Sequence, residues 1–280
     1  MFKKSTFTIL FTLVAIAFAA PQSHAQSRRR ALPKPKYSSK RLEGERWQDA
    51  FKRTYRLKNF QTLGMGSALD NAVPLKEVDL SKLATFPGQG SGFGRAFLGL
   101  RDLRFLNDPE VRGFKRRLSW MYPDDGCFIR AEWLAKLVAD HYKKPQVSKI
   151  FAFGNLKVNT KNHPDGYVTW WYHVVVGWAF QGKSYVFDPA IDPKKPMLLK
   201  DWVGSIDQDL NDVKLSICKA GTYNPDSDCD EVQSTMSKEQ AATEASYYLS
   251  AERVRLKQMG RNADQELGEH PPWLVQGRRY

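Results

Sequence analysis

The chain has 280 residues and a net charge of +13, from 43 lysines and arginines against 30 aspartates and glutamates. A basic balance of this size would suit a nucleic-acid or anionic-surface binder. However, the charge is spread along the chain, its dense run is confined to residues 27–36, and no nucleic-acid motif accompanies it. We therefore expect a basic surface and no nucleic-acid partner.

The first 25 residues are typical of a secretory signal peptide. Two lysines precede an apolar run over 7–20, and small residues before and at Ala25 offer a cleavage site. The run is too short for a comfortable membrane span, which needs about 20 apolar residues. We predict a protein that is secreted or periplasmic, with its signal peptide removed near Ala25 and no stable membrane insertion. The alternative is an uncleaved anchor.

The remainder divides into three zones by composition. A basic, proline-interrupted zone contains a predicted helix over 43–60 and ends in a glycine-rich, flexible connection at 86–94. Near the C-terminus, 237–259 lacks glycine and proline and predicts an amphipathic helix. The predicted organisation is a signal peptide (1–25), an N-terminal extension (26–95), a central domain (96–231) and a C-terminal helical tail (232–280).

A turn at 122–126 leads into a predicted helix whose first turn contains Cys127, with Asp124 or Asp125 as its cap. The unpaired N–H groups and the dipole of a helix N-terminus stabilise a thiolate, which is the reactive form of cysteine. The backbone N–H of Cys127 would also be free to bind an oxyanion. The alternative is an unreactive buried cysteine.

Residues 167–180 are aromatic and β-branched, and they predict a long strand. Gln181 and Gly182 then predict a turn, and 183–187 predicts a second strand. The pattern therefore predicts a β-hairpin, whose register depends on the length of its loop.

With a two- or four-residue loop, Asp188 lies opposite Val175 and one diagonal step from His173, on the same face of the sheet. A three-residue loop would place the carboxylate and the imidazole on opposite faces unless a bulge intervened. If they meet, Cys127, His173 and Asp188 form a catalytic Cys-His-Asp set. The alternatives are a histidine satisfied by a backbone carbonyl and an aspartate that merely starts a turn.

The other two cysteines, Cys218 and Cys229, are separated by ten turn-rich residues. This spacing suits a disulfide in an oxidising compartment and leaves Cys127 as the unpaired thiol. The chain has no C-x-x-C pair, and its five histidines are scattered. We therefore predict neither a metal site nor a cofactor.

Four short motifs occur in a fixed order: Gly126-Cys127-x-x-Arg130-Ala131, Trp170-x-Tyr172-His173-Val174, Asp188-Pro189 and Lys200-Asp201-Trp202-Val203. Between about 98 and 229 the chain thereby resembles the bacterial protein glutaminases, which deamidate glutamine side chains within proteins. The resemblance implies an α+β fold with a papain/transglutaminase-like core, in which the helix bearing the nucleophile packs on an antiparallel sheet. It also implies an inhibitory N-terminal pro-segment, and the extension before the glycine-rich stretch occupies that place.

On this resemblance Cys127, His173 and Asp188 are the nucleophile, the base and the orienting acid. The implied reaction converts glutamine in a protein or peptide to glutamate and ammonia through a thioester. We predict that Trp170, Trp171 and Tyr172 wall the substrate site, with plain core packing as the alternative.

Other functions remain open at this point. A transglutaminase would pass the acyl group to an amine, and a cysteine peptidase would cut the main chain. A secreted binding protein would need none of these residues in this order. We expect a monomeric zymogen whose partners are its glutamine-bearing substrates.

Overall fold

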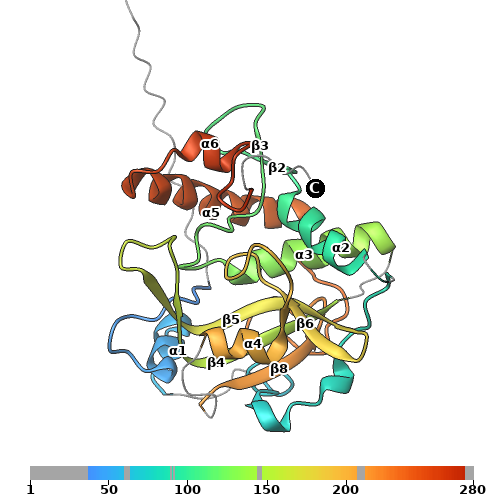
Figure 1. The fold of residues 1–280 in the computed structure, drawn as a ribbon. Coiled ribbons are helices and arrows are strands. Elements are labelled where there is room, and N and C mark those ends of the chain that lie inside the picture. Colours follow the sequence, from blue (N-terminus) through green and yellow to red (C-terminus); the bar gives the residue numbers. More distant parts are fainter. Residues whose placement is uncertain are drawn as a thin grey trace, which may run out of the picture. The chain divides into compact units, whose positions relative to one another are not determined.

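A six-stranded antiparallel sheet forms the middle of the fold, with strand order β1-β8-β4-β5-β6-β7 (Figure 1). The computed structural model describes residues 37–59, 64–88, 90, 92–143, 147–206 and 212–274. The predicted signal peptide lies outside the described residues. The prediction of an α+β fold with helices packed on an antiparallel sheet is confirmed.

The strands of this sheet are β1 (Val73–Pro74), β4 (Ser148–Asn159), β5 (Tyr167–Phe180), β6 (Lys183–Phe187), β7 (Met197–Leu198) and β8 (Lys214–Lys219). A separate two-stranded sheet pairs β2 (Leu106–Asn107) with β3 (Lys115–Arg116). The helices are α1 (Trp47–Tyr55), α2 (Gly92–Asp102), α3 (Cys127–Tyr142), α4 (Leu199–Ile206), α5 (Lys238–Gln258) and α6 (Ala263–Leu267), with short 3-10 helices η1 (Leu75–Glu77) and η2 (Leu80–Lys82).

Both faces of the sheet are buried. Successive side chains of a strand point to opposite faces, so β5 contributes to two cores. On β5, Val174 and Trp178 belong to the core that includes α3. Val175 belongs to a second core, which includes Trp202 of α4. The sheet therefore has helices on both faces, with α3 on one side and α4 on the other.

The hairpin of β5 and β6 has the register that brings the predicted site together. Val176 pairs with Phe187, and the loop consists of Gln181 and Gly182. Both loop residues have positive φ angles, 48° and 71°, as a two-residue turn matching the strand twist requires. The two-residue loop is confirmed, and Asp188 follows β6 directly.

The start of α3 differs from the prediction. The helix begins at Cys127, but its N-cap is Gly126, at φ 80°, and no side chain caps it. Asp125 accepts a hydrogen bond from the Gly126 N–H instead. A Cβ on Gly126 would lie 2.9 Å from ring carbons of Tyr248. Packing against α5, together with the left-handed backbone, therefore requires glycine here.

The C-terminal helix has the predicted ends within a residue. Ser237 caps α5 and accepts a hydrogen bond from the N–H of Gln240, whose side chain accepts one from the Ser237 N–H. This capping box satisfies N–H groups that a helix start leaves unpaired. Ala245 and Tyr248 of α5 are buried in the same core as Phe128 of α3. The tail is thus part of the main core.

The predicted N-terminal extension is also built into this core. Its helix α1 is shorter than expected, and the buried ring of Phe51 packs edge-on against Trp171 of β5 at 5.6 Å between centroids. Helix α2 begins at Gly92, so the end of the stretch predicted to be a flexible connection is helical. Phe86, just before it, is buried. Composition rich in proline and glycine had suggested a more separable segment.

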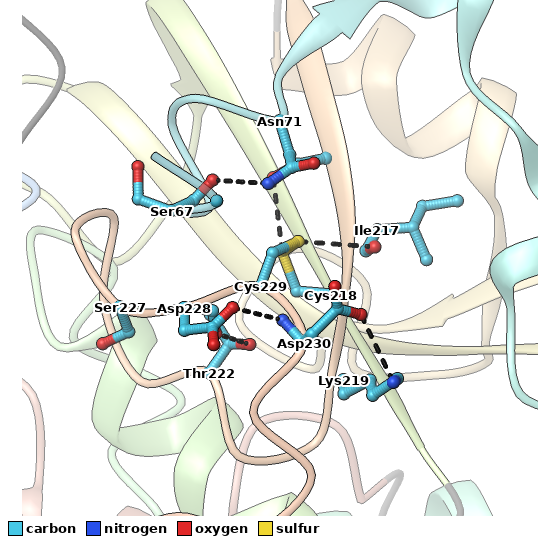
Figure 2. Close-up of a disulfide and its surroundings, with 12 residues drawn as sticks. Ser67, Asn71, Ile217, Cys218, Lys219, Thr222, Ser227, Asp228, Cys229 and Asp230 are labelled. Carbon is cyan, nitrogen blue, oxygen red and sulfur yellow. Dashed lines mark hydrogen bonds and ion pairs between the residues drawn. A yellow bond between two sulfur atoms is a disulfide. The ribbon is translucent and has the colours of Figure 1, made fainter. Parts of the chain in front are cut away.

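The predicted disulfide joins Cys218 of β8 to Cys229 (Figure 2). The N–H of Lys219 also donates to the carbonyl of Cys229 at 2.8 Å. The bridge therefore ties the loop that follows β8 back onto the strand. Among the described helices, none is long and apolar enough to cross a membrane.

Candidate active site

The fold brings His173 of β5 and Asp188, which follows β6, into direct contact. His173 Nε2 lies 2.8 Å from Asp188 Oδ2. Both side chains are buried, and so is Cys127 at the start of α3, with 1% of its surface exposed. The three predicted residues thus come from a helix start, a central strand of the sheet and the residue after the neighbouring strand.

Cys127 lies close enough to His173 to act on its pKa. As a polar and charged neighbour, Cys127 contributes to raising the pKa of His173. The second imidazole nitrogen, Nδ1, is buried and has no hydrogen-bond partner in the described part of the chain. Since Asp188 occupies Nε2, Nδ1 is the nitrogen that remains for the thiol.

The pKa values of the pair move in opposite directions. Burial lowers the pKa of His173, but the charge and hydrogen bond of Asp188, with a further contribution from Cys127, outweigh it and raise the pKa to about 9. Burial raises the pKa of Asp188, yet His173 and other donors bring it below its usual value. Each group therefore favours the charged form of the other.

Two tryptophans hold the pair in place. Trp202 Nε1 of α4 donates to Asp188 Oδ2 at 3.0 Å. The ring of Trp170 stacks on the imidazole, 4.3 Å away and tilted by 7°, and its N–H donates to the carbonyl of Pro123. Sequence reasoning missed Trp202 as a site residue, although its motif had been noted for the family resemblance.

The three aromatic residues predicted to bind substrate are interior in this structure. Trp170, Trp171 and Tyr172 have 0% of their surface exposed. Trp171 packs against α1, whereas the Tyr172 hydroxyl is buried without a hydrogen bond in the described part of the chain. They surround the site, and their role in substrate binding stays a prediction.

Residues 37–41, here called the strap, cover one side of the site. Ser39 N–H donates to Asp125 Oδ1 at 2.9 Å, and Ser38 Oγ donates to Oδ2 at 2.6 Å. The N–H of Trp171 donates to the carbonyl of Ser39 at 3.0 Å. The strap is thus attached both to the turn before Cys127 and to β5.

Helix α5 covers another side. Its Tyr248 ring lies against Gly126 and meets Phe128 edge-on at 5.9 Å. Two turns further along, Arg255 binds both carboxylate oxygens of Asp124 at 2.7 Å each. The residues immediately before Cys127 therefore contact the C-terminal helix.

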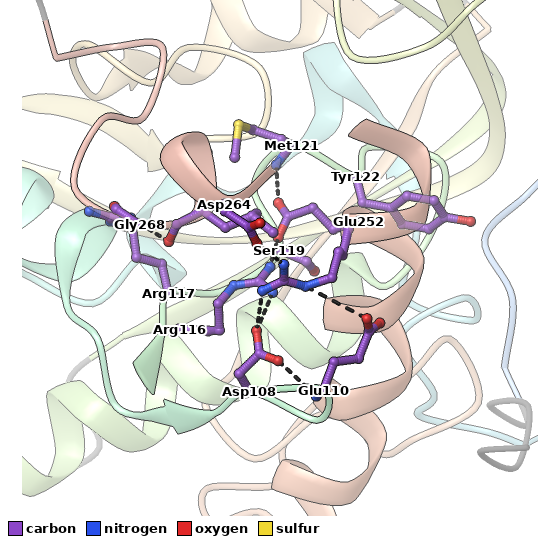
Figure 3. Close-up of polar contacts among 12 residues, drawn as sticks. Asp108, Glu110, Arg116, Arg117, Ser119, Met121, Tyr122, Glu252, Asp264 and Gly268 are labelled. Carbon is purple, nitrogen blue, oxygen red and sulfur yellow. Dashed lines mark hydrogen bonds and ion pairs between the residues drawn. The ribbon is translucent and has the colours of Figure 1, made fainter. Parts of the chain in front are cut away.

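A buried cluster of charges fastens α5 to the segment that precedes the site (Figure 3). Glu252 accepts from the N–H of Met121 at 2.7 Å and pairs with Arg116 at 2.5 Å. Asp108 pairs with both Arg116 and Arg253 at 2.9 Å. Removing one partner from a buried pair costs about 3–5 kcal/mol, so this attachment resists displacement.

Helix α3 begins with Cys127 and packs on the antiparallel sheet that carries His173, as expected from the predicted papain/transglutaminase-like core. Residues 95–206, which contain Cys127, His173 and Asp188, match the family model described as "Glutaminase". The resemblance to protein glutaminases is thereby confirmed. A comparison with curated proteins gave no match.

Solved structures of protein-glutaminases resemble the chain at low identity. A pro-protein-glutaminase is 18% identical over 56% of this chain and 57% of its own, with a TM-score of 0.40. The protein-glutaminase from Chryseobacterium proteolyticum is 18% identical over 48% and 73%, with a TM-score of 0.38. A further protein-glutaminase is 16% identical over 66% and 94%, also at 0.38. The chain spans little more than half the length of the pro-protein-glutaminase.

Proposed function

We propose that this protein hydrolyses the side-chain carboxamide of glutamine residues in proteins or peptides, giving glutamate and ammonia. The observation that carries the proposal is the buried His173–Asp188 pair beside Cys127, within the segment that matches the glutaminase family. Such a set activates a thiol toward a carbonyl carbon.

In the first half of the reaction, His173 Nδ1 takes the proton of Cys127 and holds it as an imidazolium, the form that the raised pKa of His173 favours below about pH 9. Asp188 accepts from the Nε2 side, so it selects the tautomer whose Nδ1 lone pair faces the thiol. The thiolate then attacks the carboxamide carbon, and the charge that develops on its oxygen is stabilised by backbone N–H groups at the start of α3. His173 returns the proton to the nitrogen, and ammonia leaves a thioester on Cys127.

In the second half, water gives a proton to His173 and attacks the thioester carbon. The carbon–sulfur bond breaks, glutamate is released, and Cys127 regains its proton from His173. Trp202 holds the Asp188 carboxylate through its N–H, so the orienting acid keeps its position through both halves. Transfer of the acyl group to an amine, or cleavage of a main-chain amide, would use the same residues and is distinguished by its product.

We further propose that the described state is a latent form, as expected for a zymogen. Cys127 is 1% exposed, and a protein-bound glutamine cannot reach a sulfur that buried. The strap and α5 both contact the turn that leads to Cys127. Export to an oxidising compartment is part of the same proposal, and the Cys218–Cys229 disulfide supports it.

The test incubates the disulfide-intact protein with casein, before and after limited proteolysis, and measures three products separately. Ammonia release alone, absent from a Cys127→Ala variant, supports the proposal. Incorporation of an added amine would indicate acyl transfer, and peptide fragments would indicate a peptidase. If none of the three products forms after proteolysis, although a thiol reagent still labels Cys127, the result would favour a binding protein and contradict the proposal.

A further inference from the structure

Arg130 is a buried cation one helical turn after Cys127. Its side chain is on α3, and the residue is 3% exposed. Within the described ranges, no carboxylate lies at salt-bridge distance from its guanidinium. A buried charge without a close counter-ion is costly, so its position calls for a reason.

One side of the guanidinium binds the turn that leads to the nucleophile. Nη1 donates to the carbonyls of Tyr122 at 3.1 Å and Asp125 at 2.8 Å, and it lies 3.5 Å from that of Ser119. All three contacts come from the single nitrogen Nη1, which the planar guanidinium holds in place, whereas lysine would carry its ammonium on a shorter, flexible stem. Through these bonds, Arg130 fixes the backbone that places Cys127 at the helix start.

Arg130 also lines a small cavity beside the histidine–aspartate pair. Its Nη2 is buried and has no hydrogen bond in the described part of the chain. The cavity that Arg130 shares with His173 and Asp188 has a volume of about 10 Å³, close to the space of a single water. Burial raises the pKa of Asp188, whereas His173, Trp202 and the charge of Arg130 lower it.

We propose that Arg130 is a positioning residue of the active site: it fixes the turn before Cys127 and adds positive charge beside the His173–Asp188 pair. This inference rests on the proposed function, since it assigns Arg130 to the same chemistry. A merely structural role would require only the bonds to the carbonyls.

Arg117 provides a matched control for that structural role. It is also buried, and its Nη1 donates to the carbonyls of Leu267 and Gly268. It therefore resembles Arg130 in burial and in its carbonyl partners, although its Nε also lies 3.9 Å from Asp102 Oδ1, and it does not line the cavity beside His173.

The experiment compares Arg130→Lys and Arg130→Gln with Arg117→Lys and Arg117→Gln. For each variant, the rate of Cys127 alkylation by iodoacetamide is measured against pH by mass spectrometry, together with the thermal midpoint. In Arg130→Gln, the acid limb of the profile should move to higher pH by about half to one unit, because nearby anions lose a positive neighbour. Arg130→Lys should keep the acid limb but react about 10-fold more slowly, because the turn is less well fixed.

The Arg117 variants should lower the thermal midpoint and leave the profile unchanged. The inference would be overturned if both Arg130 variants had the same alkylation-rate profile against pH as the unmodified protein. It would also be overturned if the Arg117 variants shifted that profile as much as the Arg130 variants do. Alkylation needs no substrate, so this result is independent of whether the protein releases ammonia. If Arg130→Gln does not fold, the comparison of the two lysine variants still decides whether the guanidinium of Arg130 matters.

Discussion

Replacing Asp188 with asparagine removes the charge that holds His173 protonated at neutral pH. The pKa of His173 is about 9, against an ordinary value of 6.5. This difference corresponds to about 3 kcal/mol of interaction. Without the carboxylate, burial acts on the imidazole with little opposition, so we expect a pKa of 6.5 or below. At about pH 8, the protonated fraction should then fall from roughly 90% to roughly 3%, or about 30-fold.

The assay is ammonia release from a glutamine peptide, measured from about pH 5 to about pH 10. The unmodified protein should lose activity as the pH rises through about 9. Asp188→Asn should lose it near pH 6.5 and be at least about 30-fold slower at pH 8. Asp192→Asn is the matched control. In the described part of the chain, the Asp192 side chain accepts one hydrogen bond, from the N–H of Lys194. An alkaline limb that stays near pH 9 in Asp188→Asn would refute the reasoning.

The same pKa values set the pH range in which the pair stabilises the fold. For His173, whose pKa is raised from 6.5 to about 9, the contribution is complete below pH 6.5 and is lost as the pH rises through about 9. For Asp188, whose pKa is lowered from 3.8, the contribution is present above pH 3.8 and is lost as the pH falls through its folded value. The thermal midpoint of Asp188→Asn should therefore lack the decline near pH 9.

Three more predictions follow from the site and its cover. Cys127→Ala should abolish ammonia release and change the thermal midpoint by only a few degrees, and near-normal turnover would exclude this nucleophile. Arg255→Gln breaks the bidentate ion pair with Asp124 in the turn before Cys127, so it should speed alkylation of Cys127 several-fold. Lys257 is exposed on the same helix, and Lys257→Gln should leave the alkylation rate unchanged. Equal rates in the two variants would show that α5 does not limit access to Cys127. Reducing the Cys218–Cys229 disulfide should lower the free energy of unfolding in urea by about 2–3 kcal/mol, and an unchanged midpoint would contradict the expected role of the bridge.

Local patterns predicted the elements that local chemistry determines. The register of the hairpin depends on a two-residue turn, and Gln181 and Gly182 indicated it. The start of α5 depends on Ser237 and Gln240, which form a capping box. In both cases residues close in the sequence settle the structure, so the meeting of His173 with Asp188 could be predicted as well.

Features that depend on distant contacts were not predicted. The cap of α3 is Gly126 because Tyr248, more than a hundred residues away, packs on it. Trp202 reaches Asp188 only because α4 covers the second face of the sheet. An amphipathic pattern predicts that α5 is a helix, but it does not say which surface the helix covers. The closure over Cys127 therefore required the structure.

The most direct test of the central claim is to look for the acyl-enzyme itself. The protein, opened by limited proteolysis, is mixed with a glutamine peptide, quenched in acid within a turnover and analysed by mass spectrometry. The account predicts a thioester of the peptide on Cys127, formed with release of one ammonia per adduct and absent from Cys127→Ala. Ammonia release that continues in Cys127→Ala, or an adduct on another residue, would contradict it.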